Sequence, residues 1–247
     1  MVDISDVKRL LVMVLVVCAA CGGKAKLSTE PVSGSVKERN VSFKTSDGVR
    51  LTGRLFGSGR VGVTLAHMYP ADASSWYPAA RKLAEAGYLA LAFNFRGYDG
   101  SEGPKVIPKA PDDVIAAKSF LKRSGAKQVV FIGASMGGTA SLIAAATEDA
   151  LAVVAISAPL NFMGLDAGGG IVSHVQRPTL LIASQDDPAG AFHSLEQFAQ
   201  SLPNPVTQVY SGHAHGTDLL QARPGAVDLI IRFLRRWAPV KTPEPTA

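Results

Sequence analysis

Apolar residues in this chain gather into short runs, and longer stretches of mixed apolar and polar residues separate them. Each run is short enough for one buried strand, and each mixed stretch is long enough for a helix. The runs and stretches alternate, which predicts a mostly parallel sheet with helices on both faces. The predicted strands are residues 61–66, 89–94, 129–132, 152–156, 179–183 and 206–210, and the predicted helices are residues 77–86, 112–123, 139–146, 192–201 and 219–237.

The pattern opens with a hairpin, because residues 41–45 and 49–56 flank a turn at Ser46-Asp47-Gly48. Two strand-like runs joined by such a turn predict an antiparallel pair. The predicted fold is therefore α/β, a doubly wound sheet that is parallel except at its start. A site in such a sheet lies at the carboxyl ends of the strands. The predicted strands 152–156 and 179–183 are separated only by a short irregular excursion, residues 158–176. This segment is too short to form a large lid over the site, so we expect none.

The composition indicates one globular domain. The chain has 247 residues, of which 47% are hydrophobic and 18% are charged, and this balance is typical of a folded protein with a substantial core. The formal net charge is +5, and the basic residues are spread along the chain. No basic cluster interleaved with aromatic residues stands out, which argues against nucleic acid as a partner.

Cysteine and histidine usage argues against a metal site. Both cysteines, Cys18 and Cys21, lie within the first 21 residues, so the predicted body carries neither a disulfide nor a thiolate metal site. The histidines lack the spacing of known metal-binding motifs such as H-E-x-x-H. We therefore expect no metal and no cofactor.

The N-terminus has the features of an export signal. Lys8 and Arg9 precede an apolar run at residues 10–20, which is too short for the roughly 20 residues that span a bilayer. A positive start, a short apolar run and small residues at its end are typical of a secretory signal. The sequence Cys18-Ala19-Ala20-Cys21 resembles a bacterial lipobox, although Cys18 departs from the usual leucine.

This resemblance implies that Cys21 is lipidated and that the protein is exported and anchored by lipid to the bacterial cell envelope. Residues 1–20 would then be the signal peptide, 21–40 a polar tether, 41–238 the folded domain and 239–247 a disordered tail. The alternatives are an ordinary cleaved signal peptide with an incidental Cys21, or a short core helix.

The sequence Gly133-Ala134-Ser135-Met136-Gly137 follows a strand-like run and precedes a helix-like stretch. In that context G-x-S-x-G is a nucleophile elbow, a tight turn that exposes a serine hydroxyl. Glycine two positions before and after the serine removes Cβ atoms that the turn would crowd. The alternative is a glycine-rich turn with an incidental serine, but the flanking strand and helix favour a nucleophile.

Separated motifs in the order nucleophile, acid and histidine resemble the α/β-hydrolase superfamily over about residues 41–237, and most closely its dienelactone-hydrolase-like or short serine esterase branch. The resemblance implies that Ser135 is the nucleophile, although dienelactone hydrolases carry cysteine there. In Ala183-Ser184-Gln185-Asp186-Asp187-Pro188 it implies that Asp187 is the acid, with Asp186 as the alternative. His215, followed by Gly216, matches the base.

The resemblance also implies an oxyanion hole that is formed by the backbone N–H groups of Met136 and Tyr69. Relatives have His-Gly after the third strand, whereas this chain has His67-Met68. We expect His67 to shape that loop by packing, and His213 to lie outside the catalytic set. Arg96 and Asp99, in a loop similar to the family's F-R-G-x-G-x-S turn, are expected to be structural.

These features predict a serine hydrolase that cleaves a small-molecule carboxylic ester, thioester or amide through an acyl-enzyme. The alternative from another functional class is a membrane-tethered binding module that keeps the fold without catalysis, because fold does not determine function.

Overall fold

The computed structural model describes residues 36–240. The predicted signal peptide, the lipidation site Cys21 and most of the predicted tether and tail lie outside the described residues. The first strand begins at Glu38, so the last residues of the segment predicted as a tether belong to the sheet. No helix between residues 36 and 240 combines the length and the hydropathy that crossing a membrane requires.

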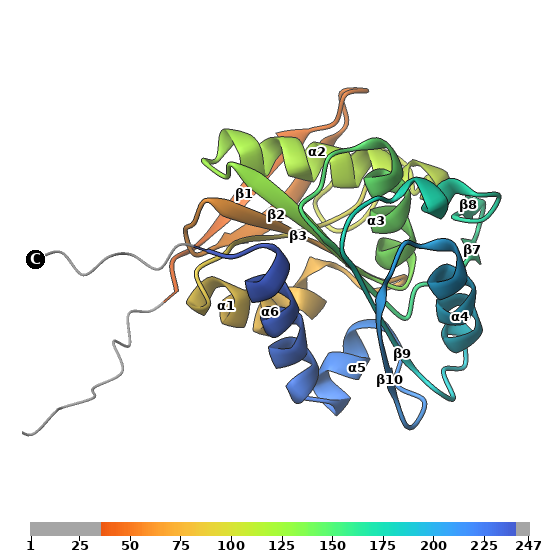
Figure 1. The fold of residues 1–247 in the computed structure, drawn as a ribbon. Coiled ribbons are helices and arrows are strands. Elements are labelled where there is room, and N and C mark those ends of the chain that lie inside the picture. Colours follow the sequence, from red (N-terminus) through yellow and green to blue (C-terminus); the bar gives the residue numbers. More distant parts are fainter. Residues whose placement is uncertain (1–35, 241–247) are drawn as a thin grey trace, which may run out of the picture. The chain divides into compact units, whose positions relative to one another are not determined.

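One sheet of eight strands organises the described part of the chain (Figure 1). The β1–β2 and β2–β4 pairs are antiparallel, and every other neighbouring pair is parallel. This arrangement confirms the predicted fold class. In spatial order the strands are β1 (Glu38–Lys44), β2 (Arg50–Phe56), β4 (Leu89–Phe93), β3 (Val61–Ala66), β5 (Gln128–Ala134), β6 (Val153–Ile156), β9 (Thr179–Ser184) and β10 (Val206–Tyr210).

Helices cover both faces of this sheet and create two apolar cores. One core lies under α2 (Ala110–Arg123), α3 (Met136–Thr147) and α4 (Ala191–Ser201). The other lies under α1 (Tyr77–Glu85), α5 (Gly216–Ala222) and α6 (Gly225–Trp237). Short 3-10 turns add η1 (Ala73–Trp76), η2 (Ile107–Lys109) and η3 (Ile171–His174).

The central strands are apolar throughout because both of their faces are buried. In β4, Leu89, Leu91 and Phe93 enter the first core, while Ala90 and Ala92 enter the second. Side chains alternate between the faces of a strand, so a strand covered on both sides reads as an unbroken apolar run. This burial is why short apolar runs located these strands in the sequence.

Two predictions about local structure were wrong in detail. The helix expected at 219–237 is divided into α5 and α6 around Pro224, because proline cannot donate the hydrogen bond that a continuing helix requires. The excursion expected to be irregular contains a hairpin, β7 (Asn161–Phe162) and β8 (Leu165–Asp166). Its turn residues Met163 and Gly164 both have positive φ angles, 46° and 84°, which suits a tight two-residue hairpin loop.

Candidate active site

The serine of the predicted elbow lies between the end of β5 and the start of α3. Ser135 has φ 51° and ψ −120°, a conformation that is rare for residues other than glycine. A Cβ atom on Gly133 would collide with the carbonyl oxygen of Gly137, and one on Gly137 would collide with the carbonyl oxygen of Ala66. Both glycines are therefore required by the close approach of backbone segments, as the motif predicts.

Ser135, His215 and Asp187 meet at the carboxyl ends of β5 and β9. The Nε2 atom of His215 lies 2.8 Å from Oγ of Ser135, although the two residues are 80 positions apart. The Nδ1 atom of His215 lies 2.9 Å from Oδ1 and 2.8 Å from Oδ2 of Asp187. The three side chains that the sequence singled out are thus in hydrogen-bonding contact.

The direction of these hydrogen bonds follows from the chemistry of the groups. An ionised carboxylate can only accept, so Nδ1–H of His215 donates a hydrogen bond to Asp187. The neutral imidazole then presents an unprotonated Nε2, which accepts the hydrogen bond from the Ser135 hydroxyl. An imidazole in this tautomer can remove the serine proton.

The two neighbouring aspartates have different surroundings. The Asp187 side chain has no exposed surface, and its Oδ1 also accepts the backbone N–H of Ala189 at 2.9 Å. Asp186 is exposed, and its backbone N–H donates to the carbonyl oxygen of Gly212 at 3.0 Å. Of the two candidates, Asp187 is the one in contact with His215.

Hydrogen bonds tie the loop that carries the aspartate to the loop that carries the histidine. Ser184, the last residue of β9, is 1% exposed, and its hydroxyl donates to the carbonyl oxygen of Ala214 at 2.6 Å. The backbone N–H of Gln185 donates to the carbonyl oxygen of Tyr210 at 2.8 Å. No signal in the sequence marks Ser184, because its partner comes 30 residues later in the chain. His213 is exposed, in keeping with its expected place outside the catalytic set.

The loop after β3 is held by His67, which is completely buried. Its Nε2 accepts the backbone N–H of Phe95 at 3.3 Å, so Nδ1 carries the proton and donates to the carbonyl oxygen of Met68 at 2.9 Å. The rings of Phe95 and Tyr98 meet it edge-on. Burial lowers the pKa of His67 to about 4, so the ring is neutral near pH 7. This is the packing role that the sequence predicted.

The next residue, Met68, stands where the resemblance predicted glycine. Its side chain lies against Gly216, where a Cβ atom would collide with the Met68 sulfur. Gly216 has φ 56° and directly follows His215. The methionine therefore fills space beside the histidine loop, and Gly216 is the residue that accommodates it.

Tyr69 faces the hairpin of the excursion. Its side chain is 42% exposed, and its ring centroid lies 5.6 Å from that of Phe162 in β7. Met163, at the tip of the same hairpin, is 64% exposed. No sequence signal marked Phe162, because only the folded hairpin brings it to the loop after β3. Tyr69 and Phe162 together form an apolar rim beside the loop after β3.

Arg96 and Asp99 have structural contacts, as predicted. Arg96 donates to Asp113 at 2.6 Å and to Asp47 at 2.8 Å. Burial raises the pKa of Asp113, while two hydrogen bonds from the Arg96 guanidinium and one from its backbone N–H favour the ionised carboxylate. The carbonyl oxygen of Asp99 accepts the Asn94 amide at 2.7 Å. Among residues 36–240, no group of three or more His, Cys, Asp or Glu side chains is arranged to hold a metal ion.

A known family matches the middle of the described chain, from β3 onward. Residues 63–170 match a family described as alpha/beta hydrolase fold. Over 135 residues the chain is 36% identical to epoxide hydrolase A of Mycobacterium tuberculosis, covering 51% of this chain and 40% of that protein. Over 93 residues it is 38% identical to the bifunctional epoxide hydrolase 2 of Sus scrofa, covering 37% of this chain and 17% of that protein. The chain therefore spans less than half the length of these relatives.

Solved structures match the fold over a larger part of the chain. An esterase of Pyrococcus furiosus superposes with a TM-score of 0.69 at 20% identity, covering 82% of this chain and 91% of that one. A Pseudomonas aeruginosa protein of hypothetical function superposes with a TM-score of 0.71 at 17% identity, covering 84% of this chain and 95% of that one. At these identities the likeness concerns the fold alone, which is the α/β-hydrolase fold.

Proposed function

Because this chain belongs to the α/β-hydrolase superfamily, we propose that it is a serine hydrolase that cleaves a carboxylic ester, thioester or amide through an acyl-enzyme. One observation carries the proposal: His215 contacts the hydroxyl of Ser135 with one ring nitrogen and the carboxylate of Asp187 with the other. A serine without a neighbouring base is a weak nucleophile at neutral pH. Within the superfamily, we propose that the chain belongs to the short serine esterase branch.

In the first half of the proposed reaction, Nε2 of His215 takes the Ser135 proton as Oγ attacks the substrate carbonyl carbon. Asp187 orients the imidazolium that forms and stabilises its charge. The imidazolium then gives its proton to the leaving alcohol, thiol or amine, which leaves an ester on Ser135. In the second half, His215 removes a proton from water, the hydroxide attacks the ester, and Oγ recovers the proton.

We assign the oxyanion hole to the backbone N–H groups of Met136 and Tyr69. Met136 is the first residue of α3, where backbone N–H groups have no partner within the helix and the dipole favours negative charge. Tyr69 follows Met68, whose carbonyl oxygen is fixed by the buried His67. Loss of one oxyanion donor typically costs about 3 kcal/mol of transition-state stabilisation.

The apolar rim of Tyr69 and Phe162 favours an apolar group in a small-molecule substrate. These side chains lie beside the proposed oxyanion loop, where burial of apolar surface contributes about 25 cal/mol per Å². Phe162→Ala should therefore raise KM for esters with a bulky apolar group more than for acetyl esters.

Epoxide opening is a second candidate, because sequence relatives bear the name epoxide hydrolase. Attack of the Ser135 oxygen on an epoxide carbon would form an ether, which has no carbonyl at which water could release the product. Turnover would then require direct attack by a water molecule that His215 activates. An ester adduct can be hydrolysed, so the serine favours acyl substrates.

The test compares wild type with Ser135→Ala and with the control Ser201→Ala on a short p-nitrophenyl ester and on styrene oxide. Ser201 is exposed at the end of α4, where its hydroxyl donates to the carbonyl oxygen of Gln197 in the same helix. We expect ester turnover that only Ser135→Ala abolishes. Ester turnover that persists in Ser135→Ala contradicts the proposal, and turnover of styrene oxide alone supports the second candidate.

A fluorophosphonate probe separates the enzyme from a non-catalytic binding module on the same fold. The probe phosphonylates an activated serine, so labelling should occur in wild type and in Ser201→Ala and be lost in Ser135→Ala. A wild-type protein that binds a ligand but is never labelled favours the binding module.

We also propose that the protein is exported and attached to the bacterial cell envelope by a lipid on Cys21. The support is the sequence alone: an apolar run at residues 10–20 that ends in small residues before the cysteine. Metabolic labelling with an alkyne fatty acid should mark wild type and fail in Cys21→Ala. Equal labelling of both proteins contradicts the assignment.

A further inference from the structure

Basic residues gather on the side of the sheet opposite the candidate active site. We call this side the amino-end face, because the parallel strands begin there and the helices between them end there (Figure 1). The only exposed acids that lie at these strand starts or in the last turns of these helices, within residues 36–240, are Glu85 and Asp149. The exposed basic residues of this face are Lys37, Arg39, Arg60, Lys82, Lys122, Arg123, Lys127, Arg177, Arg235 and Arg236.

Helix capping explains only part of this charge. Lys and Arg are favourable in the last turn of a helix, where the backbone carbonyls create partial negative charge. This accounts for basic residues such as Lys122 and Arg123 at the end of α2. It does not account for Arg60 and Lys127, which stand directly before β3 and β5, whereas Arg177, close to the start of β9, is paired with Asp149.

The opposite face has a different balance. The loops at the carboxyl ends of the strands and the adjoining turns carry several exposed acids and few exposed bases, so the charge of the folded domain is polarised along the strands. The exposed acids are Asp47, Asp99, Glu102, Asp166, Asp186 and Asp218, and the exposed bases are Lys44, Lys105 and Lys109.

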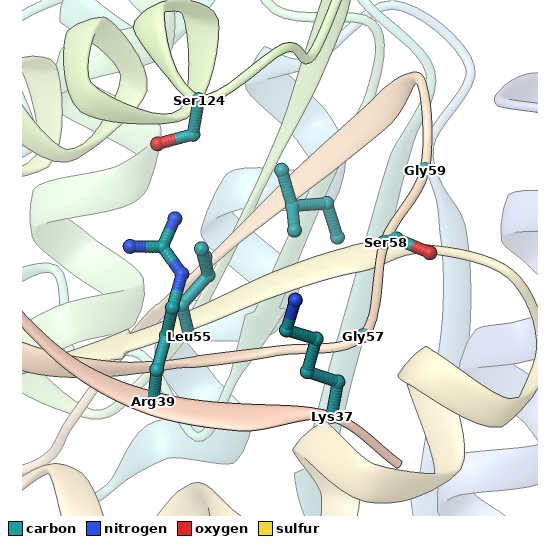
Figure 2. A pocket seen from close by; sticks show the side chains of 8 residues that line it. Lys37, Arg39, Leu55, Gly57, Ser58, Gly59 and Ser124 are labelled. Atoms are coloured by element: carbon teal, nitrogen blue, oxygen red, sulfur yellow. The ribbon is translucent and has the colours of Figure 1, made fainter. Parts of the chain in front are cut away.

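A cationic pocket of about 190 Å³ lies at the edge of the amino-end face. Figure 2 shows Lys37 and Arg39 side by side with their charged ends toward the same opening, and the hydroxyl of Ser124 facing the guanidinium. Arg39 lies in β1 and Lys37 directly before it, and residues two positions apart in extended chain point to the same side. Glu38, which lies between them in sequence, instead pairs with Arg81 and Arg54. Leu55 and Leu89 add an apolar surface.

The backbone fixes this pocket. The carbonyl oxygen of Lys37 accepts the N–H of Gly57 at 2.8 Å, and Arg39 is in register with Leu55 of β2. The pocket therefore presents two cations from the start of β1, which is hydrogen-bonded in place, and a hydroxyl from the end of α2. Such a group of donors suits the oxygens of a phosphate.

Apolar side chains stand on the same face. Trp237, the last residue of α6, is 39% exposed, and the Arg236 guanidinium lies 5.0 Å from its ring centroid. Val206, the first residue of β10, is 44% exposed. Tryptophan and arginine are favoured where a protein meets lipid headgroups. The tryptophan ring buries apolar surface there, and the arginine guanidinium pairs with charged headgroups.

The first and last described residues also lie at this face. Val36 lies two residues before β1, and the Val240 side chain lies against Gly87, just before β4. A lipid on Cys21 would join the domain through the segment before Val36. A basic face attracts anionic headgroups, so it favours the orientation of the domain in which this face meets the membrane.

We propose that the amino-end face binds a bilayer containing anionic phospholipid, with lipid phosphate in the pocket of Lys37 and Arg39. The candidate active site then faces away from the membrane, toward soluble substrate. This inference is independent of the proposed hydrolysis, because it concerns charges at the other end of the strands and is tested without measuring activity.

The first test measures association of the full chain with vesicles. Every protein carries Cys21→Ser, so no lipid is attached, and vesicles contain either phosphatidylcholine alone or phosphatidylcholine with phosphatidylglycerol. Neutral vesicles report the contribution of the apolar run at residues 10–20, which all variants share. We expect phosphatidylglycerol to strengthen association, and salt at about 0.5 M to abolish that gain, since it shortens the Debye length.

Matched charge variants locate the contact. Lys37→Ser combined with Arg39→Ser should weaken the association with anionic vesicles roughly tenfold or more, given the usual contribution of each basic residue near such a surface. Lys44→Ser combined with Lys105→Ser removes the same charge from the opposite side and should change association by less than about twofold. Equal effects of the two pairs, or no gain from phosphatidylglycerol, overturn the proposal.

The second test uses tryptophan as a position marker. The chain has two tryptophans, and Trp76 is 1% exposed in the second core. Doxyl-labelled lipids in anionic vesicles should quench part of the emission, and Trp237→Phe should remove the quenched part. If the protein binds these vesicles while Trp237 remains unquenched, the amino-end face is not the surface in contact. If inorganic phosphate binds wild type and not the Lys37→Ser, Arg39→Ser variant, while neither protein associates with anionic vesicles, the pocket belongs to free phosphate and the lipid assignment is wrong.

Discussion

The hydroxyl of Ser184 lies 2.6 Å from the carbonyl oxygen of Ala214, the residue before His215. This bond joins the end of β9, which leads to Asp187, to the loop that carries the histidine. It therefore links the positions of two members of the proposed triad without contact with the reacting atoms.

Ser184→Ala should lower kcat about tenfold with little change in KM. The substitution leaves a carbonyl oxygen without its buried partner, which typically costs about 1–3 kcal/mol, and loosens the histidine loop. Ser184→Thr, which keeps the hydroxyl, should recover most of the activity. Steady-state kinetics on a p-nitrophenyl ester measure both, and a loss confined to stability, with kcat unchanged, would leave Ser184 without a positioning role.

Asp187→Asn and Asp186→Asn form a matched pair of adjacent substitutions. The amide that replaces the Asp187 carboxylate is not an ionised acceptor for Nδ1–H of His215, and the corresponding change in a serine protease lowers kcat about 10⁴-fold. Asp186 is exposed and does not contact His215, so its substitution should leave kcat within about twofold. A reversed order of effects, measured by steady-state kinetics, would assign the acid to Asp186.

Gly137→Ala should abolish activity and destabilise the domain, because its Cβ would collide with the carbonyl oxygens of Ala66 and His67. Overpacking of this kind typically costs about 1–3 kcal/mol. Gly225→Ala is the control: space is open around Gly225 at the start of α6, and alanine favours a helix by up to about 1 kcal/mol. Chemical denaturation of both variants distinguishes a clash from a general intolerance of alanine.

Stability should fall as pH falls from about 6.5 to about 4, in part because of His67. Burial lowers its folded-state pKa to about 4, while an unfolded histidine titrates near 6.5. Between these values the unfolded state takes up a proton that the folded state does not, so acid favours unfolding by up to about 3 kcal/mol.

The variant His67→Gln, which does not titrate, isolates this contribution. It should be less stable than wild type at pH 7 but should lose less free energy of unfolding between pH 6.5 and 4, as measured by urea denaturation. The same loss in both proteins would show that other groups cause the acid sensitivity.

Asp113→Ala should destabilise the domain by about 3–5 kcal/mol, because it leaves the buried Arg96 without its main partner. The side chains of Asp113 and Arg96 are 0% and 6% exposed. The neighbouring pair Asp112–Lys109 is exposed, so Asp112→Ala should cost less than about 1 kcal/mol. Urea denaturation of the two variants measures the difference. Similar losses of unfolding free energy would mean that the buried pair stabilises the domain no more than the exposed pair does.

Most of the sheet could be predicted because its signals are local. Strands such as β4 are buried on both faces and are apolar throughout, and the elbow needs glycine on both sides of Ser135. The hairpin that carries Phe162 was not predicted, because two residues per strand are too few for a pattern. The break at Pro224 was missed although proline is a strong signal, since apolar residues continue at helical spacing on both sides.

By itself, the sequence determined the α/β architecture, the elbow serine and the order of the candidate motifs, because burial and tight turns constrain neighbouring residues. Only the tertiary structure decided that Asp187 contacts His215 while Asp186 does not, and that Ser184 joins their loops. It also gathered scattered cations such as Lys37, Arg60 and Lys127 on one face. These residues are distant in the chain. They come together because the register and the direction of the parallel strands determine which loops lie side by side.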